Sequence, residues 1–375
     1  MNQAWGTNME VKRNNRRRVF RYINGQGTVS NPDIAYATKM SLPTVTQITK
    51  ELLEEGLLEE RGELQSTGGR RARALSVAAD ARLAAGVDIT KNHVSFALTN
   101  LAGEMLKYHR CARPFAAEDA YWQQTGSMLE AFLEESGACG ERMLGVGISF
   151  PGIVDLDRQM IAESHILGVK ELPFGAVSRF FPYPSVFLND ANAGAYAEGI
   201  GGGNAGRFFY LSLSNTVGGA LFAEGRLEQG AHFRCGEAGH MTIVPDGERC
   251  YCSKRGCLDA YCAARCLSDR TEGKLERFFQ GLEQGDEALG AAWDVYTDYL
   301  AVAVNNLHMI LDCDIVLGGY VGSYVEDYLP GIRDKVALRN TFAGDGGFVR
   351  GCRHKVGAAT LGAALSVMER FVEEI

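Results

Sequence analysis

The sequence predicts a mainly α-helical winged helix-turn-helix domain at the N-terminus, followed by an α/β core of two lobes. Three helical segments and a glycine-rich basic turn before residue 78 predict the first part. A meander of strands followed by a helix occurs twice after residue 82 and predicts the second part. A length of 375 residues suits two or three domains. We expect a winged helix-turn-helix domain at 1–80, a first lobe at 81–200 and a second lobe at 201–375.

The three N-terminal helices are predicted from apolar spacing and from residues that begin or end a helix. Residues 14–24 predict a basic helix that Gly25-Gln26-Gly27 ends, and a short helix follows at about 31–39. Pro43 suits the first turn of a third helix at about 43–55, because its missing N–H is not needed there. Four apolar residues share one face of this third helix: Val45, Ile48, Leu52 and Leu53.

The opposite face of the third helix carries side chains that can reach DNA bases and phosphates: Thr44, Thr46, Gln47 and Lys50. A strand, a glycine turn and a second strand follow and predict a wing, with Arg70, Arg71 and Arg73 at its tip and second strand. We expect the third helix to enter the major groove of double-stranded DNA and the wing to lie along the backbone or minor groove. The alternative is a small three-helix unit with one polar face.

The rest of the chain alternates between strands of buried type and helices. The first unit has strands at 83–89, 93–99, 105–110 and 144–150, with a helix at about 117–136, and the fourth strand ends in Pro151-Gly152. A strand at 185–188 leads into Asn189-Asp190 and a helix at 191–198. The second unit has strands at 207–213, 218–222 and 315–317, with helices at about 285–311 and 356–372. The repetition predicts two similar lobes with a cleft between them.

The second lobe contains one histidine and three cysteines with the spacing H-x9-C-x-C-x4-C: His240, Cys250, Cys252 and Cys257. These are ligands that Zn²⁺ takes, and four of them complete a tetrahedron. Because no coordination position would stay open, we expect one structural zinc ion per chain and no catalytic metal. The alternative is a set of buried or disulfide-paired thiols.

Composition and charge limit the possible classes of protein. No apolar run reaches the 18 residues of a membrane span, and the polar N-terminus lacks the apolar stretch of a signal peptide. We therefore expect a cytoplasmic protein whose ten cysteines are metal ligands and buried thiols. The net charge of −8 divides into +3 over residues 1–80 and −11 over the remainder, which favours a polyanion as partner of the N-terminal part.

Five motifs occur in a specific order along nearly the whole chain. They are STGGRR in the wing, G-V-G-I-S-x-P-G up to Gly152, Asn189-Asp190-Ala191-Asn192-Ala193, Gly236-Glu237-x-Gly239-His240, and C-x-C-x4-C-L-acid up to Asp259. In this order they resemble the ROK family (repressor, open reading frame, kinase). The resemblance is to its transcriptional-regulator branch, which includes repressors of N-acetylglucosamine and xylose genes. It implies an actin-like, two-lobed core similar to that of sugar kinases.

The resemblance also implies a sugar in the cleft, with contacts from Gly152, Asn189, Asp190, Glu237, His240 and Asp259. Carboxylates and amides offer the acceptors and donors that sugar hydroxyls need. Asp259 departs from the glutamate that is usual in the family and is one methylene shorter, so either the ligand lies differently or this contact is lost. For Asn189-Asp190 the alternative is a cap of the helix that follows.

Two stretches argue against kinase activity. Kinases of this fold need glycine-rich turns where backbone N–H groups approach the phosphates of ATP. The family loop of the form D-x-G-G-T is replaced here by Asp88-Ile89-Thr90-Lys91-Asn92, and the loop of the form G-T-G-x-G-G-G by Ser214–Ala220, which has lost three glycines. Asp190 matches the general base of the kinases, but a base without a positioned phosphoryl donor is not sufficient.

Together these features predict a sugar-responsive DNA-binding transcriptional regulator that is not an enzyme. By family analogy it is a repressor of carbohydrate genes, released by a sugar or sugar phosphate. We expect a homodimer or homotetramer on a palindromic operator, and we expect the zinc loop to couple the cleft to the DNA-binding domain. Two alternatives stay open, namely an ATP-dependent sugar kinase that also binds DNA and a regulator controlled by a protein partner.

Overall fold

The computed structural model describes residues 8–63, 73–138, 140–200, 206–342 and 344–375. The N-terminal domain contains the three predicted helices, α1 (Asn8–Gln26), α2 (Asn31–Thr38) and α3 (Leu42–Glu54), followed by strands β1 (Leu58–Glu63) and β2 (Arg73–Val77). Ser30 and Ser41 cap α2 and α3 by accepting the N–H groups of Asp33 and Thr44. β1 and β2 pair antiparallel, so the two strands of the wing are confirmed.

The apolar face predicted for α3 is buried. Val45 and Leu52 are fully enclosed, and Ile48 is 3% exposed, while Leu53 packs against the same core at partial exposure. Val19, Phe20 and Ile23 of α1 lie in this core. The amphipathic spacing of residues 45–53 therefore places Thr44, Thr46, Gln47 and Lys50 outside, as predicted, and all four are exposed.

The first lobe is a five-stranded mixed sheet of order β10-β6-β3-β4-β5. Its strands are β3 (Leu83–Ile89), β4 (His93–Asn100), β5 (Met105–Ala112), β6 (Met143–Phe150) and β10 (Ser185–Asn189), and α4 (Asp119–Glu135) packs on it. β10, β6 and β3 run parallel, so the carboxyl ends of β10 and β6 meet at one edge. A small sheet that the pattern did not predict follows β6: β7 (Ile153–Asp155), β8 (Met160–Ser164) and β9 (Val169–Pro173), before the short helix α5 (Phe174–Ser178).

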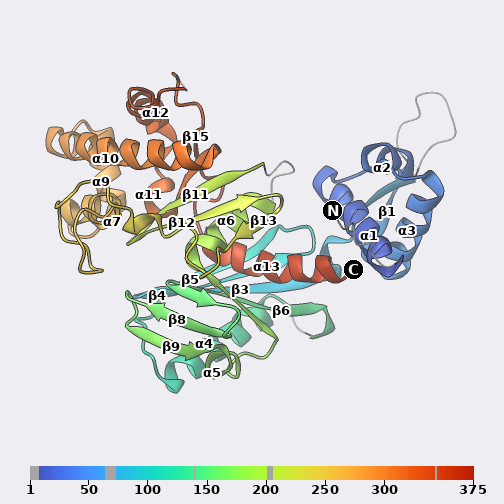
Figure 1. The fold of residues 1–375 in the computed structure, drawn as a ribbon. Helices are drawn as coiled ribbons and strands as arrows, with labels where there is room; N and C mark the ends of the chain where they lie inside the picture. The colour runs from blue at the N-terminus through green and yellow to red at the C-terminus, as the bar shows by residue number, and fades with distance from the viewer. Residues whose placement is uncertain (1–7, 64–72, 139, 201–205, 343) are drawn as a thin grey trace.

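The second lobe contains a sheet of order β13-β12-β11-β14-β15. The strands are β11 (Phe208–Leu213), β12 (Val217–Ala223), β13 (Arg226–Glu228), β14 (Asp314–Gly318) and β15 (Val349–Gly351). The long helix α10 (Glu287–Leu311) lies against this lobe, as Figure 1 shows, with shorter helices α7 (Asp259–Cys262), α8 (Arg265–Ser268), α9 (Leu275–Glu283), α11 (Gly319–Gly322) and α12 (Leu329–Ala337). Among the described residues, no helix is long and apolar enough to cross a membrane.

The last helix, α13 (Ala358–Glu374), corrects the expected domain division. It lies on the first lobe, where it contacts β3, β6 and α6 (Asp190–Ile200). Glycines make this close approach possible, because a Cβ on Gly86 or Gly147 would collide with a backbone carbonyl of α13, and one on Gly362 would collide with a carbonyl of α6. The assignment of all of residues 201–375 to the second lobe is therefore wrong for α13.

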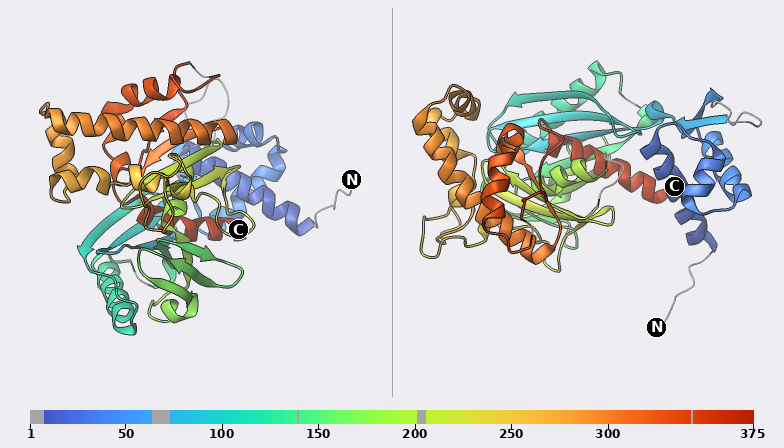
Figure 2. Two further views of the ribbon diagram at one scale, coloured as in Figure 1. Left: turned by 60° about the vertical axis from the view of Figure 1, so that its left-hand side comes forward. Right: turned by 90° about the horizontal axis from the view of Figure 1, so that it is seen from above.

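The same helix also supports the DNA-binding domain. Ala364, Val367, Met368 and Val372 belong to one apolar cluster with the core of the N-terminal domain. Arg17 and Arg21 of α1 form ion pairs with Glu369 and Glu373 of α13. The views in Figures 1 and 2 agree that the C-terminus lies beside α1. The N-terminal domain is thus docked on the helix that also packs against the first lobe.

Candidate functional site

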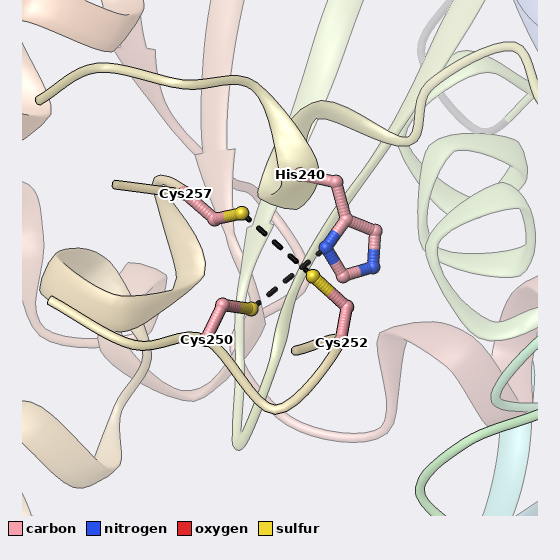
Figure 3. A group of neighbouring side chains, drawn as sticks. All are labelled: His240, Cys250, Cys252 and Cys257. Carbon is pink, nitrogen blue, oxygen red and sulfur yellow. Dashed lines mark hydrogen bonds between the residues drawn. The ribbon is translucent and has the colours of Figure 1, made fainter. Parts of the chain in front are cut away.

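The four predicted metal ligands converge on one point of the second lobe (Figure 3). Their ligand atoms all lie within 4.8 Å of one another. The Sγ atoms of Cys252 and Cys257 are 3.8 Å apart, and Cys250 Sγ is 3.9 Å from His240 Nδ1. Two thiolates on a tetrahedral zinc with Zn–S bonds of about 2.3 Å would lie about 3.8 Å apart. This group of donors could hold a metal ion, and its spacing fits a tetrahedral one.

Tyr251, which lies between two of the cysteines, fixes the orientation of the histidine. Its hydroxyl is 3.2 Å from His240 Nε2, the ring nitrogen that does not face the cysteines. Such a partner on the second nitrogen orients a metal-binding imidazole. The ring of Tyr251 also contacts His165 of the first lobe edge to face, with 6.1 Å between ring centroids. The predicted metal site therefore touches the opposite lobe through this tyrosine.

A pocket of about 330 Å³ lies beside the carboxyl end of β10. Three of the six predicted sugar contacts line it: Gly152, Asn189 and Glu237. Gly152 forms the turn after β6 with φ +138°, a conformation that favours glycine, and a Cβ there would collide with the carbonyl of Glu163. Burial raises the pKa of Glu237, while His240, His165 and Arg234 lower it. The pocket thus contains a carboxyl, an amide and a close backbone turn.

Asn189 carries out the alternative role that the sequence left open. Its Oδ1 accepts hydrogen bonds from the N–H groups of Ala191 (2.9 Å) and Asn192 (3.1 Å), which caps α6. Its Nδ2 donates to the carbonyl of Gly152 at 3.0 Å. The side chain therefore joins the end of β10 to the turn after β6 and holds the floor of the pocket.

Two carboxyl groups outside the pocket lining, those of Asp190 and Asp88, are close enough for Asp190 to affect the pKa of Asp88. Burial raises the pKa of Asp190 to about 6, and Glu237 raises it further, while backbone N–H groups at the start of α6 lower it. Burial likewise raises the pKa of Asp88 to about 7, with Asp190 as a further cause, while a hydrogen bond from Ser149 Oγ (2.7 Å) and the charge of Arg110 lower it. Near neutral pH these carboxyls are therefore partly protonated.

Asp259 does not line the pocket, which differs from the expected sugar contact. Its side chain is fully buried. One oxygen accepts the N–H of Val217 at 2.7 Å, and the other lies 3.4 Å from a guanidinium nitrogen of Arg265. His240 lies with the cysteines and outside the pocket lining. The structure thus brings together Gly152, Asn189 and Glu237, leaves Asp190 outside the pocket lining, and gives Asp259 a bond to the start of β12.

The predicted DNA-contacting face is partly engaged within the protein. Gln47 Nε2 donates to Glu51 at 3.0 Å, and Lys50 lies 3.7 Å from Glu54, while Thr44 and Thr46 are exposed. Arg73 is exposed and pairs with Glu60 on the neighbouring strand. Arg70 and Arg71 lie outside the described residues.

Four of the five arginines of α1 bind other groups of the protein. Arg16 pairs with Glu51 and Glu55, Arg17 and Arg21 pair with α13, and Arg18 donates to the carbonyl of Thr38 at 2.6 Å. Part of the positive charge of residues 1–80 is therefore used for packing between helices. These four side chains therefore do not carry the predicted contact with a polyanion.

Residues 84–369 match the family model described as the ROK family, and residues 12–59 match the model described as winged helix-turn-helix DNA-binding. The chain belongs to the ROK family. The xylose repressor of Caldicellulosiruptor bescii is 26% identical over 363 residues, which cover 90% of this chain and 91% of that protein. The DNA-binding transcriptional dual regulator NagC of Escherichia coli is 26% identical over 275 residues, 72% of this chain and 67% of NagC.

A solved ROK transcriptional regulator, a homologue of the E. coli MLC protein, shares the fold of this chain. Its TM-score is 0.77 at 21% sequence identity, and the match covers 97% of both chains. The predicted combination of a winged helix-turn-helix domain and a two-lobed ROK core is confirmed.

The two stretches that correspond to the phosphate loops of ROK kinases form closed turns. The hydroxyl of Thr90 donates to the carbonyl of His93 at 3.0 Å and accepts the N–H of the same residue at 3.1 Å. In the second loop, the N–H of Val217 is already bonded to the carboxylate of Asp259. A carboxylate at this position occupies a backbone donor and repels phosphate. The sequence showed an acidic residue shortly after Cys257, namely Asp259. That its carboxylate binds the N–H of Val217 depends on the fold and could not be predicted.

A contact between the lobes lies near Asp88. The guanidinium carbon of Arg110 in β5 is 5.7 Å from the ring centroid of Tyr320 in α11, a cation–π distance. Asp88, Asp190 and Arg110 all affect the pKa of Tyr320, although burial is the main cause of its rise to about 12. Neither Arg110 nor Tyr320 belongs to a sequence motif, so local patterns gave no signal for them.

Proposed function

We propose that this ROK protein is a sugar-responsive DNA-binding transcriptional regulator, a repressor whose operator binding is released by a sugar or sugar phosphate. The observation that carries the proposal is the path from the pocket to the DNA-binding domain. The pocket is formed at the start of α6, α6 packs along α13, and α13 shares an apolar core and ion pairs with the N-terminal domain. Repressors named for xylose and N-acetylglucosamine among the relatives support the ligand class.

The proposed ligand contact in the pocket is Glu237, with Asn189 and Gly152 as the frame that positions it. Asp190 is outside the pocket lining but close enough to Glu237 for that residue to affect its pKa, and we propose it as a second contact. A partly protonated carboxyl can both donate and accept hydrogen bonds, which suits sugar hydroxyls. For His240 we propose the metal site alone, and for Asp259 a bond that holds the start of β12. A buried polar site of this kind discriminates strongly against ligands that lack a hydroxyl, because its own groups would stay unpaired.

The proposed metal is one structural Zn²⁺ per chain, held by His240, Cys250, Cys252 and Cys257. Three thiols and an imidazole within one short segment match the ligand preference of zinc. Such an ion would fix the segment that carries Glu237, only three residues before His240. We therefore propose that the zinc loop stabilises the pocket and takes part in its coupling to the DNA-binding domain.

For DNA binding we propose that the exposed face of α3 enters the major groove and that the wing contacts the backbone. Thr44, Thr46, Gln47 and Lys50 are the proposed contacts on α3, with Arg70, Arg71 and Arg73 on the wing. A homodimer or homotetramer would present two such domains to a palindromic operator. In support, large apolar side chains are exposed around the carboxyl ends of α10 and α12, which pack on each other: Met309, Ile310, Leu338 and Phe342.

The test is a fluorescence titration of the protein onto DNA from upstream of its own gene, repeated with a panel of sugars and sugar phosphates. Binding that one ligand releases is the expected result. Binding that no sugar releases would favour control by a protein partner. A coupled assay with ATP and the same sugars tests the kinase alternative, which the loss of glycines in both phosphate loops disfavours.

A further inference from the structure

The pocket extends beyond the part that the predicted sugar contacts line. Its further lining comes from α6, α13 and the β12–β13 hairpin with the loop that follows: Asn192, Tyr196, Ser366, Arg226, Leu227 and Gln229. From Asn189 to Tyr196 the chain advances seven positions along α6, which is about 10 Å at 1.5 Å per residue and roughly the length of two sugar rings. The volume of about 330 Å³ lies within the range of about 300–1,000 Å³ of sites for drug-sized ligands.

One buried polar atom in this outer half lacks the hydrogen-bond partner that folded proteins normally provide. Asn192 Oδ1 is buried and has no hydrogen-bond partner in the described parts of the chain. Buried amide oxygens are usually satisfied, so this atom points to a ligand or water. Arg226 is an exposed residue that also lines this pocket, so its guanidinium is accessible to a ligand. Amide and guanidinium groups are suitable donors and acceptors for a second set of hydroxyls.

An aromatic ring lines the pocket from the loop after β13. Phe233 has φ +54°, in the left-handed region that bulky residues rarely adopt, and it lies between Gly230 and Gly236, which both have positive φ. Strained backbone of this kind concentrates at ligand sites, where the surrounding structure enforces it. Together with Leu227 and Leu188, the ring offers an apolar surface for the C–H face of a sugar.

We propose that the outer half is a second sugar subsite, so that the effector is a disaccharide or other glycoside and not a single monosaccharide. The first unit lies at Glu237, and the second lies against Asn192, Tyr196 and Arg226. This inference rests on the proposed function, because it concerns the same pocket. The subsite also lies on the path to the DNA-binding domain, because Tyr196 belongs to α6, which packs along α13. Tyr196 lies close enough to Glu369 and Arg21 for both to affect its pKa, which burial mainly raises, to about 12.

The test is calorimetric titration of the full chain with three groups of ligands. The monosaccharides are glucose, xylose and N-acetylglucosamine, and the disaccharides are cellobiose, maltose, xylobiose and chitobiose. The sugar phosphates are the 6-phosphates of glucose and N-acetylglucosamine. We expect one disaccharide to bind at least about tenfold more tightly than its monosaccharide. A tenfold gain in affinity corresponds to one or two additional net hydrogen bonds. Arg226→Gln and Tyr196→Phe should weaken the disaccharide several-fold and leave the monosaccharide unchanged.

The matched control is Arg277→Gln, which removes an exposed arginine of α9 away from the pocket lining and should change neither affinity. Equal binding of monosaccharide and disaccharide, or tightest binding of a 6-phosphate, would overturn the second subsite and leave the sugar-responsive regulator intact. If no sugar or sugar phosphate binds or releases the operator, both proposals fail. Tyr196→Phe removes one hydroxyl and keeps the ring in its contact with Phe222, so it is designed to fold.

Discussion

Asp88 should destabilise the folded protein as the pH rises toward neutrality. Its pKa is about 7 in the fold, against about 3.9 in an unfolded chain. The groups that face it are Ser149, Asp190, Arg110 and Tyr320. Each pKa unit corresponds to about 1.4 kcal/mol, so the ionised carboxyl costs at most about 4 kcal/mol above pH 7. Because the residue keeps some exposed surface, we expect about half of that.

The perturbation is Asp88→Asn, which keeps the size of the side chain and an acceptor for Ser149 Oγ. Below about pH 4 the carboxyl is protonated in both states, so the two proteins should differ little. Between about pH 4 and 7 the unfolded carboxyl ionises while the folded one keeps its proton, so the natural protein loses stability relative to the variant. Above pH 7 both states are ionised and the difference becomes constant.

The assay is urea unfolding of both proteins in zinc-containing buffer between pH 6 and 8.5, a range in which cysteine and histidine ligands keep their metal. The variant should be the more stable at every pH, and its advantage should grow by about 1 kcal/mol from pH 6 to 8.5. The control is Asp157→Asn, at an exposed turn between β7 and β8. Two curves that run parallel over this range would refute the raised pKa of Asp88.

Three further predictions concern the metal, the operator and the docking of the N-terminal domain. Removing zinc with a chelator, or changing Cys252 to Ser, should lower the midpoint of thermal unfolding and the zinc content measured by atomic absorption. If sugar affinity and operator release stay unchanged after the zinc is removed, coupling through the zinc loop is contradicted. Gln47→Ala should weaken operator binding by about 1–3 kcal/mol, and the loss should depend on the DNA sequence. Lys50→Ala should weaken binding to all DNA sequences and reduce the slope of log K against log salt concentration by about one. Glu373→Lys should weaken docking of α1 on α13 by about 1 kcal/mol at low salt and by less at high salt, and the measurement is faster proteolysis between the domains. The control is Glu374→Lys, which should not change the rate, because Glu374 pairs with Arg370 of its own helix.

Local patterns were sufficient where a residue's environment depends on its near neighbours. The spacing of Val45, Ile48 and Leu52 placed α3 with the correct side inward, because a helix repeats every 3.6 residues. The spacing of His240 and the three cysteines predicted that these four possible metal ligands come together, because short loops bring such ligands close to one another. Both predictions needed only a few consecutive turns of chain.

Contacts between distant segments were beyond these patterns. α13 reads as an ordinary apolar helix, and nothing in residues 358–374 indicates that it returns to strands formed some 210 to 275 residues earlier. The reason for its position lies in Gly86, Gly147 and Gly362, whose missing side chains allow backbones to touch. Likewise, the acid at Asp259 was visible, but its bond to Val217 depends on how β12 meets the metal loop.

The energies at the docking surface indicate how the regulator must switch. A change from 1% to 99% occupancy of a state requires about 5.5 kcal/mol of differential ligand binding. The ion pairs of Arg17 and Arg21 are partly exposed and contribute about 1 kcal/mol or less each. In contrast, Val367, Met368 and Val372 are buried in the core shared with the N-terminal domain, and exposing each fully would cost about 1.5–3 kcal/mol. Detaching the domain would break these ion pairs and also expose part of the shared apolar surface, so we expect α13 and the DNA-binding domain to move as one body. In a dimer, such a movement changes the distance between the two α3 helices. This distance must match the spacing of the two half-sites of a palindromic operator for both helices to bind.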